Sequence, residues 1–327
     1  MARPLRIQWP GALYHITHRG NEGCAIFRDD RDRRRLLECV ERAVERFALR
    51  VHAICLMSNH YHAQVETPRG NLAAAMHWLS TTYTVYFNRR HERSGHLFHG
   101  RYWSAVVEKQ SYLAELTRYI HLNPVRAGLV ARPEAYPWSS YRDYVTSRPR
   151  WHWLETGWTL EQFGGANRRG RARYREFVEG VLPADLNDPL VKAVSGAILG
   201  SDAFVGWVSD QFLSGRKDTA AARVRRQIDA VPIDEVIRVV AELTGTAEET
   251  VRARGRHGNE ARELAMYLAQ QHSGATNVAI GAAFGGIAGT NVSYTSRKVR
   301  ERLRRDRDFR DRCRRTERRL SDRGQTS

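Results

Sequence analysis

The sequence lacks paired cysteines, long apolar runs and an apolar leader. Its four cysteines are scattered through 327 residues with no C-x-x-C pair, which excludes a disulfide framework and a zinc ribbon. No run approaches the roughly 18 apolar residues that span a bilayer, and the first residues have no apolar core typical of a secretory signal. We therefore expect a protein of the reducing cytoplasm with no membrane partner.

Acidic residues are few relative to basic ones. The chain has 53 Lys and Arg against 36 Asp and Glu, so its formal net charge is +17. Its 42% hydrophobic and 27% charged residues are ordinary for a globular protein, and its length suggests about two domains. A field of this sign favours a polyanion, most often nucleic acid. A merely soluble basic protein is the alternative.

The first 145 residues alternate strand-like and helix-like patterns. Apolar spacing predicts helices after Asp29, after Asn71 and after Ser111, the last ending near Leu122. Between them the pattern predicts four short strands, at residues 13–18, 51–57, 61–66 and 102–108. The order is that of a split β-α-β unit, an antiparallel sheet with helices on one face, so we expect an α+β fold.

The pattern weakens beyond residue 145. We interpret residues 146–230 as a helical connector, 231–303 as an all-α domain and 304–327 as a basic tail. Residues 297–323 include 14 basic and 6 acidic residues. Such a segment is typical of a mobile solvated helix, although it could also hold phosphates without reading sequence.

The most specific local feature is the segment from Asn59 to Glu66, which contains His60 and His62. Because side chains alternate along a strand, these two histidines, with Gln64 and Glu66, are expected on one face. Two imidazoles one strand repeat apart can bind one divalent metal. Alternatively, they decorate a solvated edge.

A second feature lies on the third predicted helix. Tyr119 and Asn123 are four residues apart and so share a flank of that helix. A tyrosine hydroxyl there could attack phosphorus if a cation stabilised the developing charge. A half-buried packing tyrosine is the alternative, and Tyr112, two turns earlier, is the rival nucleophile.

The segment from Asn88 to Trp103 alternates arginines with aromatic residues. This arrangement suits an unpaired nucleic-acid strand, because cations follow phosphates while rings stack on bases. A solvated charged face is the alternative. The candidate DNA contacts in this half of the chain are Arg3, Arg6, Arg19, Arg89, Arg90 and Arg101.

Several of these segments together resemble the REP-associated tyrosine transposases of the HUH single-tyrosine group. The resemblance covers roughly residues 3–145, in the stretches RPLR, PGALYHIT, CLMSNHYH, YFNRRH, GHLFHGRY and YIHLNPVRAGLV. It implies a ferredoxin-like catalytic domain that cuts and rejoins single-stranded DNA, often at palindromic hairpins. It also implies that His60 and His62 are metal ligands, that Tyr119 is the nucleophile and that Asn123 completes the metal site.

The resemblance implies a mechanism that needs no nucleotide cofactor. A divalent metal, Mg²⁺ or Mn²⁺, would polarise the phosphate while Tyr119 attacks, which gives a 5′-phosphotyrosine bond and a free 3′-hydroxyl. A free tyrosine has a pKa of about 10, so another group must assist its deprotonation. The sequence does not identify that group.

Near the C-terminus, two helices joined by a Gly-containing turn fit a helix-turn-helix. Residues 233–300 resemble the duplex-binding domain of the replication initiator DnaA, although Ala288-Gly289-Thr290-Asn291 stands where that family has Asp-His-Thr-Thr. The base preference is therefore not expected to carry over. The candidate contacts are Thr290, Asn291, Ser293 and Arg297. A purely packing helical bundle is the alternative.

We therefore expect a DNA strand transferase that acts on single-stranded or hairpin DNA and holds duplex DNA through its C-terminal domain. A homodimer is compatible with this function. A non-catalytic DNA-binding regulator is one alternative, although the presence of His60, His62, Tyr119 and Asn123 argues against it. A metal-dependent nuclease that uses water as its nucleophile is the other, and it would form no covalent adduct.

Overall fold

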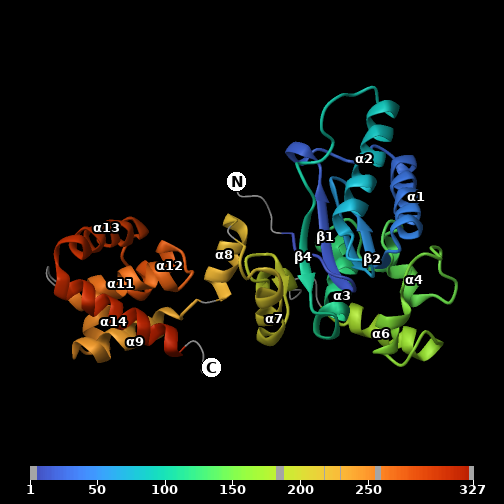
Figure 1. Cartoon of the computed structure of the whole chain (residues 1–327). Helices are drawn as coiled ribbons and strands as arrows, with labels where there is room; N and C mark the ends of the chain where they lie inside the picture. The colour runs from blue at the N-terminus through green and yellow to red at the C-terminus, as the bar shows by residue number, and fades with distance from the viewer. Residues whose placement is uncertain (1–5, 182–187, 217, 229, 255–258, 324–327) are drawn as a thin grey trace. The chain divides into compact units, whose positions relative to one another are not determined.

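The chain forms two compact units, residues 1–216 (unit 1) and residues 217–327 (unit 2), each described here by itself (Figure 1). The computed structural model describes residues 6–181, 188–216, 218–228, 230–254 and 259–323. The division falls at residue 216, within the segment that the sequence analysis interprets as a connector.

Unit 1 is built on a five-stranded sheet. Its strands are β1 (Ala12–Arg19), β2 (Arg50–Leu56), β3 (His60–Thr67), β4 (Trp103–Val107) and β5 (Ile198–Leu199). They lie in the order β2-β3-β1-β4-β5, antiparallel except that β5 is parallel to β4. The four predicted strands are confirmed. The short β5 was not predicted.

Three long helices accompany these strands: α1 (Asp30–Phe47), α2 (Leu72–Arg90) and α3 (Lys109–Arg126). Asp29 caps α1, because its side chain accepts hydrogen bonds from the backbone N–H groups of Arg31 and Asp32. Helix α3 begins before Ser111, the predicted cap, and it continues through Pro124. The Tyr119–Asn123 segment therefore lies entirely within a helix.

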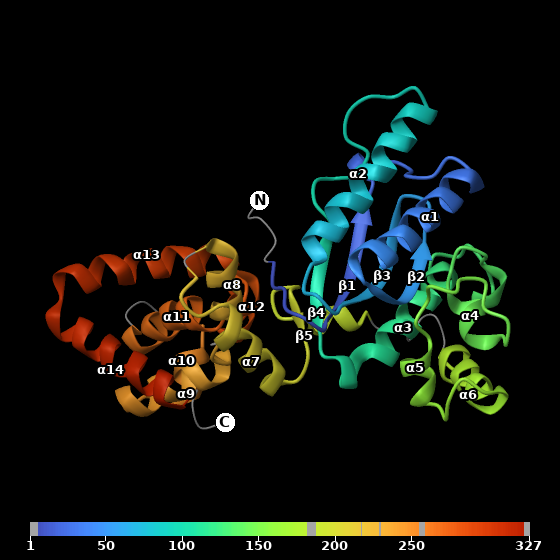
Figure 2. The same cartoon turned by 45° about the vertical axis from the view of Figure 1, so that its right-hand side comes forward.

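The helices cover both faces of the sheet rather than one (Figures 1 and 2). On one face, His18 of β1 forms a hydrogen bond with Ser80 of α2. On the other, Gln64 of β3 accepts a hydrogen bond from Thr117 of α3 and donates one to the backbone of Leu113. Alternation along β3 thus directs His60, His62, Gln64 and Glu66 toward α3, as the strand pattern predicts.

The segment that follows the third helix belongs to the core of unit 1. It contains α4 (Tyr141–Val145), α5 (Gly157–Glu161), α6 (Arg168–Glu179) and α7 (Asp202–Phe212). Leu160, Tyr174 and Val178 are buried in one cluster with Leu116 and Ile120 of α3. The described residues of α5 and α6 therefore do not simply connect two domains: they pack against α3 on the side that the sheet leaves uncovered.

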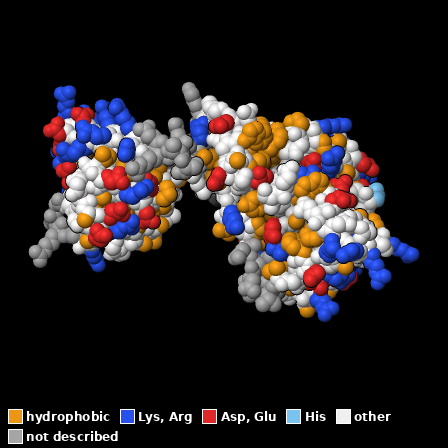
Figure 3. Space-filling model, turned by 90° about the horizontal axis from the view of Figure 1, so that it is seen from below, with side chains coloured by type: hydrophobic (Ala, Val, Ile, Leu, Met, Phe, Trp, Pro, Cys, Tyr) orange, Lys and Arg blue, Asp and Glu red, His pale blue; other side chains and the backbone are white. Residues whose placement is uncertain are grey.

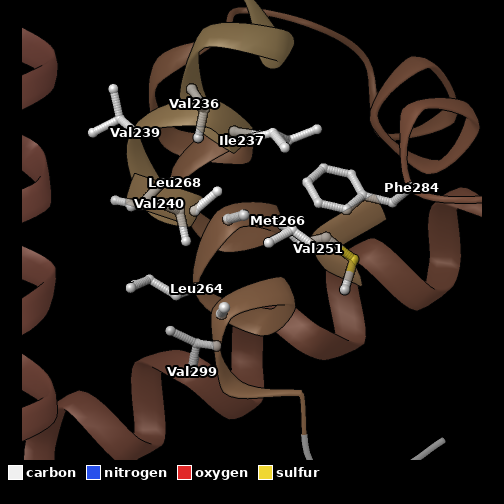
Figure 4. Close-up of a cluster of buried hydrophobic side chains, with 14 of the residues drawn as sticks. Val236, Ile237, Val239, Val240, Val251, Leu264, Met266, Leu268, Phe284 and Val299 are labelled. Atoms are coloured by element: carbon white, nitrogen blue, oxygen red, sulfur yellow. The ribbon is translucent and has the colours of Figure 1, made fainter. Parts of the chain in front are cut away.

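Unit 2 is entirely helical in its described part. Its helices are α8 (Thr219–Ile228), α9 (Ile233–Thr244), α10 (Glu248–Arg252), α11 (Glu260–His272), α12 (Asn277–Ala283), α13 (Gly289–Arg305) and α14 (Arg307–Arg323). Aliphatic residues of α9 and α11 are buried in one cluster with Phe284 (Figure 4). The turn between α12 and α13 contains Gly285 and Gly286, whose φ angles are 75° and 71°. This left-handed backbone conformation favours glycine.

The basic C-terminal segment is packed rather than free. Phe309, Cys313 and Leu320 of α14 are buried in the same cluster as the aliphatic residues of α9. These positions recur at a helical spacing, so one face of α14 is apolar although most of its residues are charged. The structure thus corrects the interpretation of residues 304–323 as a solvated tail.

The chain is α+β, as predicted, with a mixed sheet in unit 1 and helices alone in the described part of unit 2. Among the residues that the structure describes, no helix combines the length and the apolar character that crossing a bilayer requires.

Candidate active site

The two histidines of β3 direct their Nε2 atoms toward each other. The distance between Nε2 of His60 and Nε2 of His62 is 3.1 Å. Two nitrogens that occupy adjacent positions on the same octahedral ion, each about 2.1 Å from it, lie about 3.0 Å from each other. The spacing of the two Nε2 atoms therefore fits one shared cation. His62 is buried and His60 is partly exposed. Of the two imidazoles, that of His60 is therefore the more accessible to solvent.

The outer nitrogens of both rings have hydrogen-bond partners. Nδ1 of His60 lies 2.7 Å from Oδ1 of Asn59, and the Asn59 amide is oriented because its Nδ2 donates to the carbonyl of Gly23. Nδ1 of His62 lies 3.1 Å from Nε2 of His15 and 3.2 Å from Oγ1 of Thr17. Such partners fix the orientation of metal-binding imidazoles.

Burial keeps both imidazoles of the pair neutral. It lowers the pKa of His60, and the nearby positive charge of Arg19 lowers it further. It also lowers the pKa of His62 to well below the ordinary value, with His15 and His60 acting in the same direction. Neutral imidazole is the form that binds metals.

Tyr119 of α3 lies next to this pair. Its ring centroid is 6.1 Å from that of His62 and 6.4 Å from that of His15, with both contacts edge to face. Its hydroxyl donates a 2.9 Å hydrogen bond to Oδ2 of Asp188, and the guanidinium of Arg126 lies 5.2 Å from its ring centroid. The structure thus brings the predicted phenol and imidazoles together from separate elements.

The environment of Tyr119 keeps its hydroxyl protonated at neutral pH. Burial raises the pKa of this phenol, and so does the negative charge of Asp188, while Arg126 opposes both. The Asp188 carboxylate accepts the hydrogen bond of this phenol, so it is the group placed to take up a proton that leaves the Tyr119 hydroxyl.

Asn123 lies one turn beyond Tyr119 and is also buried. Its Nδ2 donates a 2.9 Å hydrogen bond to the backbone carbonyl of Tyr119, a bond that does not use the amide oxygen. In the described part of the chain, no three His, Cys, Asp or Glu side chains are grouped to hold a metal ion. A third protein ligand would therefore have to be of another type, such as the Asn123 amide oxygen.

The rival nucleophile occupies a different position. Tyr112 packs, partly buried, against the core cluster beneath α3. It lies seven residues before Tyr119, about 10 Å along the helix axis. The contacts to the histidine pair described above are made by Tyr119.

The arginines proposed to contact DNA differ in their surroundings. Arg3 lies outside the described residues, Arg6 stacks over Tyr102 at 5.2 Å, and Arg19 pairs with His60 in the β1–β3 register. Arg89 and Arg101 are exposed. Arg90 is held by Asp29 and Asp32.

Two aromatic residues of the segment from Asn88 to Trp103 are not available to stack on bases. Phe98 and Tyr102 are both buried, and Phe98 stacks on His18 at 3.8 Å between ring centroids. They belong to the face of the sheet opposite α3. The structure thus removes Phe98 and Tyr102 from the predicted stacking and phosphate surface of residues 88–103, whereas the partly exposed Trp103, which lies 5.6 Å from His15 between ring centroids, and the exposed arginines remain candidates.

The four candidate contacts of unit 2 all lie on α13 and are exposed: Thr290, Asn291, Ser293 and Arg297. The Ser293 hydroxyl accepts a 2.8 Å hydrogen bond from Asn277 of α12. Tyr294, which sequence reasoning missed, is 64% exposed and lies under the Arg297 guanidinium. On the face of unit 2 seen in Figure 3, Lys and Arg side chains alternate with Asp and Glu.

Sequence reasoning also missed several residues around the histidine pair. Asp188 lies 69 residues beyond Tyr119 in a segment without clear periodicity, and no local signal could have found it. His15 and Thr17 could have been found, because strand alternation places them on one face of β1. Arg126 is the last residue of α3, seven residues after Tyr119 on the same helix.

Two family models match parts of the chain. Residues 10–123 match "Transposase IS200 like", and residues 233–299 match "Bacterial dnaA protein helix-turn-helix". These matches confirm both resemblances that the sequence carries. The first covers the histidine pair, Tyr119 and Asn123, and the second covers the four α13 candidates.

Curated relatives agree with the two matches. A REP-associated tyrosine transposase of Haemophilus influenzae is 27% identical over 108 residues, 30% of this chain and 61% of that protein. The replication initiator DnaA of Thermus thermophilus is 31% identical over 128 residues, 36% of this chain and 28% of that protein. A solved structure of a REP-associated tyrosine transposase bound to a REP hairpin has 16% sequence identity and a TM-score of 0.39, covering 44% of this chain and 86% of that one.

Proposed function

We propose that the protein is a DNA strand transferase that cuts and rejoins single-stranded DNA at hairpins through a covalent tyrosine intermediate. One observation carries this proposal: Tyr119 lies beside the His60–His62 pair, with its hydroxyl bonded to a carboxylate. The match of residues 10–123 to a transposase family model supports it independently.

The proposed reaction is a transesterification. The Tyr119 oxygen attacks the scissile phosphorus, a new phosphorus–oxygen bond forms, and the bond to the 3′ oxygen breaks. The phenolic proton passes to Oδ2 of Asp188, which already accepts its hydrogen bond. The departing 3′ oxygen takes a proton from solvent, so the products are a 5′-phosphotyrosine bond, a 3′-hydroxyl and a protonated Asp188. A second 3′-hydroxyl reverses the step and joins strands, so no nucleotide cofactor is required.

The site fits a divalent cation such as Mg²⁺ or Mn²⁺. His60 and His62 would hold it through Nε2, with Asn123 as the third protein ligand. When bound, the cation would stabilise negative charge on the phosphate oxygens. The protein itself orients both imidazoles through Asn59, His15 and Thr17 and positions the phenol through Asp188.

Unit 2 is proposed to hold duplex DNA while unit 1 acts on a single strand. Its α12–turn–α13 arrangement is that of a helix-turn-helix, in which the second helix enters the major groove. The exposed Thr290, Asn291 and Arg297 are the proposed contacts. Ser293 is proposed only to orient the helix pair, because its hydroxyl binds Asn277.

The decisive experiment is a covalent-adduct assay with Tyr119→Phe. The full chain is incubated with labelled hairpin oligonucleotides and Mn²⁺, and the products are separated on denaturing gels. The wild type is expected to form an adduct and Tyr119→Phe none, with binding of the hairpin nearly unchanged. Tyr112→Phe is the matched control and should retain the adduct.

The same gels distinguish the alternative functions. A DNA-binding regulator without activity would bind the hairpin but would neither cleave it nor form an adduct. A nuclease that uses water would cleave without an adduct, and Tyr119→Phe would leave its cleavage intact. An adduct retained by Tyr119→Phe would assign the nucleophile to another residue.

A further inference from the structure

The hydrogen bonds around the histidine pair form one continuous chain. It runs from Asn59 through His60 and His62 to His15, with Thr17 as a second neighbour of His62. Consecutive nitrogens in it lie 3.1 Å apart. Each neutral imidazole carries one proton, so the position of a proton on one ring restricts its position on the next.

The Asn59 end of the chain is fixed. The Asn59 amide nitrogen donates to the Gly23 carbonyl, so its oxygen must face Nδ1 of His60 as an acceptor. His60 therefore carries its proton on Nδ1, and its Nε2 presents a lone pair. His60 is in the tautomer that a cation needs without any change.

The His15 end sets a conflicting requirement. His15 is fully buried, and its Nδ1 has no hydrogen-bond partner among the described residues. A buried N–H without an acceptor is rarer and less favourable than a buried lone pair without a donor. His15 should therefore carry its proton on Nε2 and donate it to Nδ1 of His62, which leaves the His62 proton on Nε2, facing the lone pair of His60.

We propose that His15 is a positioning residue that holds His62 in the tautomer that cannot bind a cation through Nε2. Binding of a cation then requires a tautomer change in His62 and in His15, while His60 keeps its tautomer. In the loaded state the His62 proton lies on Nδ1, where Thr17 or His15 accepts it. His15 then carries its proton on Nδ1. Each ring keeps one proton throughout, so loading releases none. This inference rests on the proposed function for the identity of the metal site.

The two neighbours of His62 should then act in opposite directions. His15→Phe keeps an aromatic ring but removes the competing N–H, and Thr17 remains to accept the His62 proton. We expect this variant to bind Mn²⁺ about tenfold more tightly. Thr17→Val removes the hydroxyl acceptor and should weaken Mn²⁺ binding severalfold. Asn59→Leu removes the oxygen that holds the His60 proton on Nδ1, so it should weaken Mn²⁺ binding about tenfold. Asn59→Asp keeps an oxygen there and should not weaken Mn²⁺ binding.

The experiment has two readouts besides activity. Long-range ¹⁵N–¹H spectra of the histidine-labelled full chain report which nitrogen of His62 carries the proton, without and with Mg²⁺. We expect the proton on Nε2 without Mg²⁺ and on Nδ1 with it. Electron paramagnetic resonance then gives Mn²⁺ affinities for the wild type and the four variants.

Two results would overturn the inference. One is a His62 proton that already lies on Nδ1 in the metal-free wild type, a measurement that depends on no variant. The other is weaker Mn²⁺ binding by a folded His15→Phe. Failure of the proposed function is seen separately, because a chain with the expected tautomers and Mn²⁺ affinities would then form no adduct through Tyr119.

Discussion

The two units present their polar groups in opposite ways. In unit 1 the candidate site residues come from separate elements and are buried or half-buried: His62 of β3 and Tyr119 of α3 are buried, and Asp188, from beyond α6, is half-buried. In unit 2 the candidate contacts are exposed along the single helix α13 above an aliphatic core. Bond-forming groups require fixed geometry and little water, whereas a surface that reads DNA must be accessible.

The largest expected effect separates the two units by function. Replacing both His60 and His62 with alanine should remove cleavage with Mg²⁺ and with Mn²⁺, because both nitrogens that fit a cation are lost. Binding of duplex DNA should not change, since the replaced residues lie in unit 1. Cleavage gels and binding titrations on the same preparations measure both properties. The exposed His77→Ala is the control, and unchanged cleavage by the double variant would refute the metal pair.

A smaller difference between the two units is expected in their stability at acidic pH. Burial lowers the pKa of His18 to about 4 and that of His121 to about 3, against 6.5 in the unfolded chain. The unfolded state therefore takes up protons first, and stability that is present in full above pH 6.5 is lost as the pH falls toward these values. Each histidine contributes about 1.4 kcal/mol per pH unit within that window.

Unit 2 has no buried histidine among its described residues, so its stability should change less over this range. Hydrogen exchange followed by mass spectrometry from pH 7 to pH 4.5 can measure the two units separately. We expect protection to fall first in unit 1. Parallel loss of protection in both units would contradict the comparison.

The smallest effect concerns unit 2 alone. Arg297→Gln should weaken duplex binding by about 1–3 kcal/mol if Arg297 contacts a base. If Arg297 contacts a phosphate instead, the slope of log binding constant against log salt concentration should become shallower by about one. Cleavage of a single-stranded hairpin should be unaffected. Arg168→Gln, an exposed position on α6, matches the change in charge and should leave duplex binding unaltered.

Local patterns predicted most of the elements but not how they pack. Alternation at residues 13–18 and 61–66 and the cap at Asp29 predicted β1, β3 and the start of α1, because each depends on neighbours in the sequence. The burial of α14 was missed because Phe309 and Leu320 are widely spaced among arginines. Helices were placed on one face because a strand pattern does not show which helix covers which side.

The site was predicted to a similar extent. The spacing of His60 and His62 predicted their shared face, and resemblance alone assigned a role to Tyr119. Asp188 contacts Tyr119 across 69 residues of sequence, and only tertiary structure brings such positions together. Arg90 seemed a DNA contact in the sequence because its partner Asp32 lies 58 residues earlier.

The short strand β5 has a practical consequence for isolating unit 1. Among the described residues, β5 is the strand that pairs with this edge of the sheet, through Val106 and Val107 of β4. A fragment that stopped near residue 145 would leave β4 as a bare outer strand, a template for pairing with other chains and hence for aggregation. A fragment extended to residue 216 keeps β5 paired with β4 and retains Asp188, the carboxylate that Tyr119 contacts.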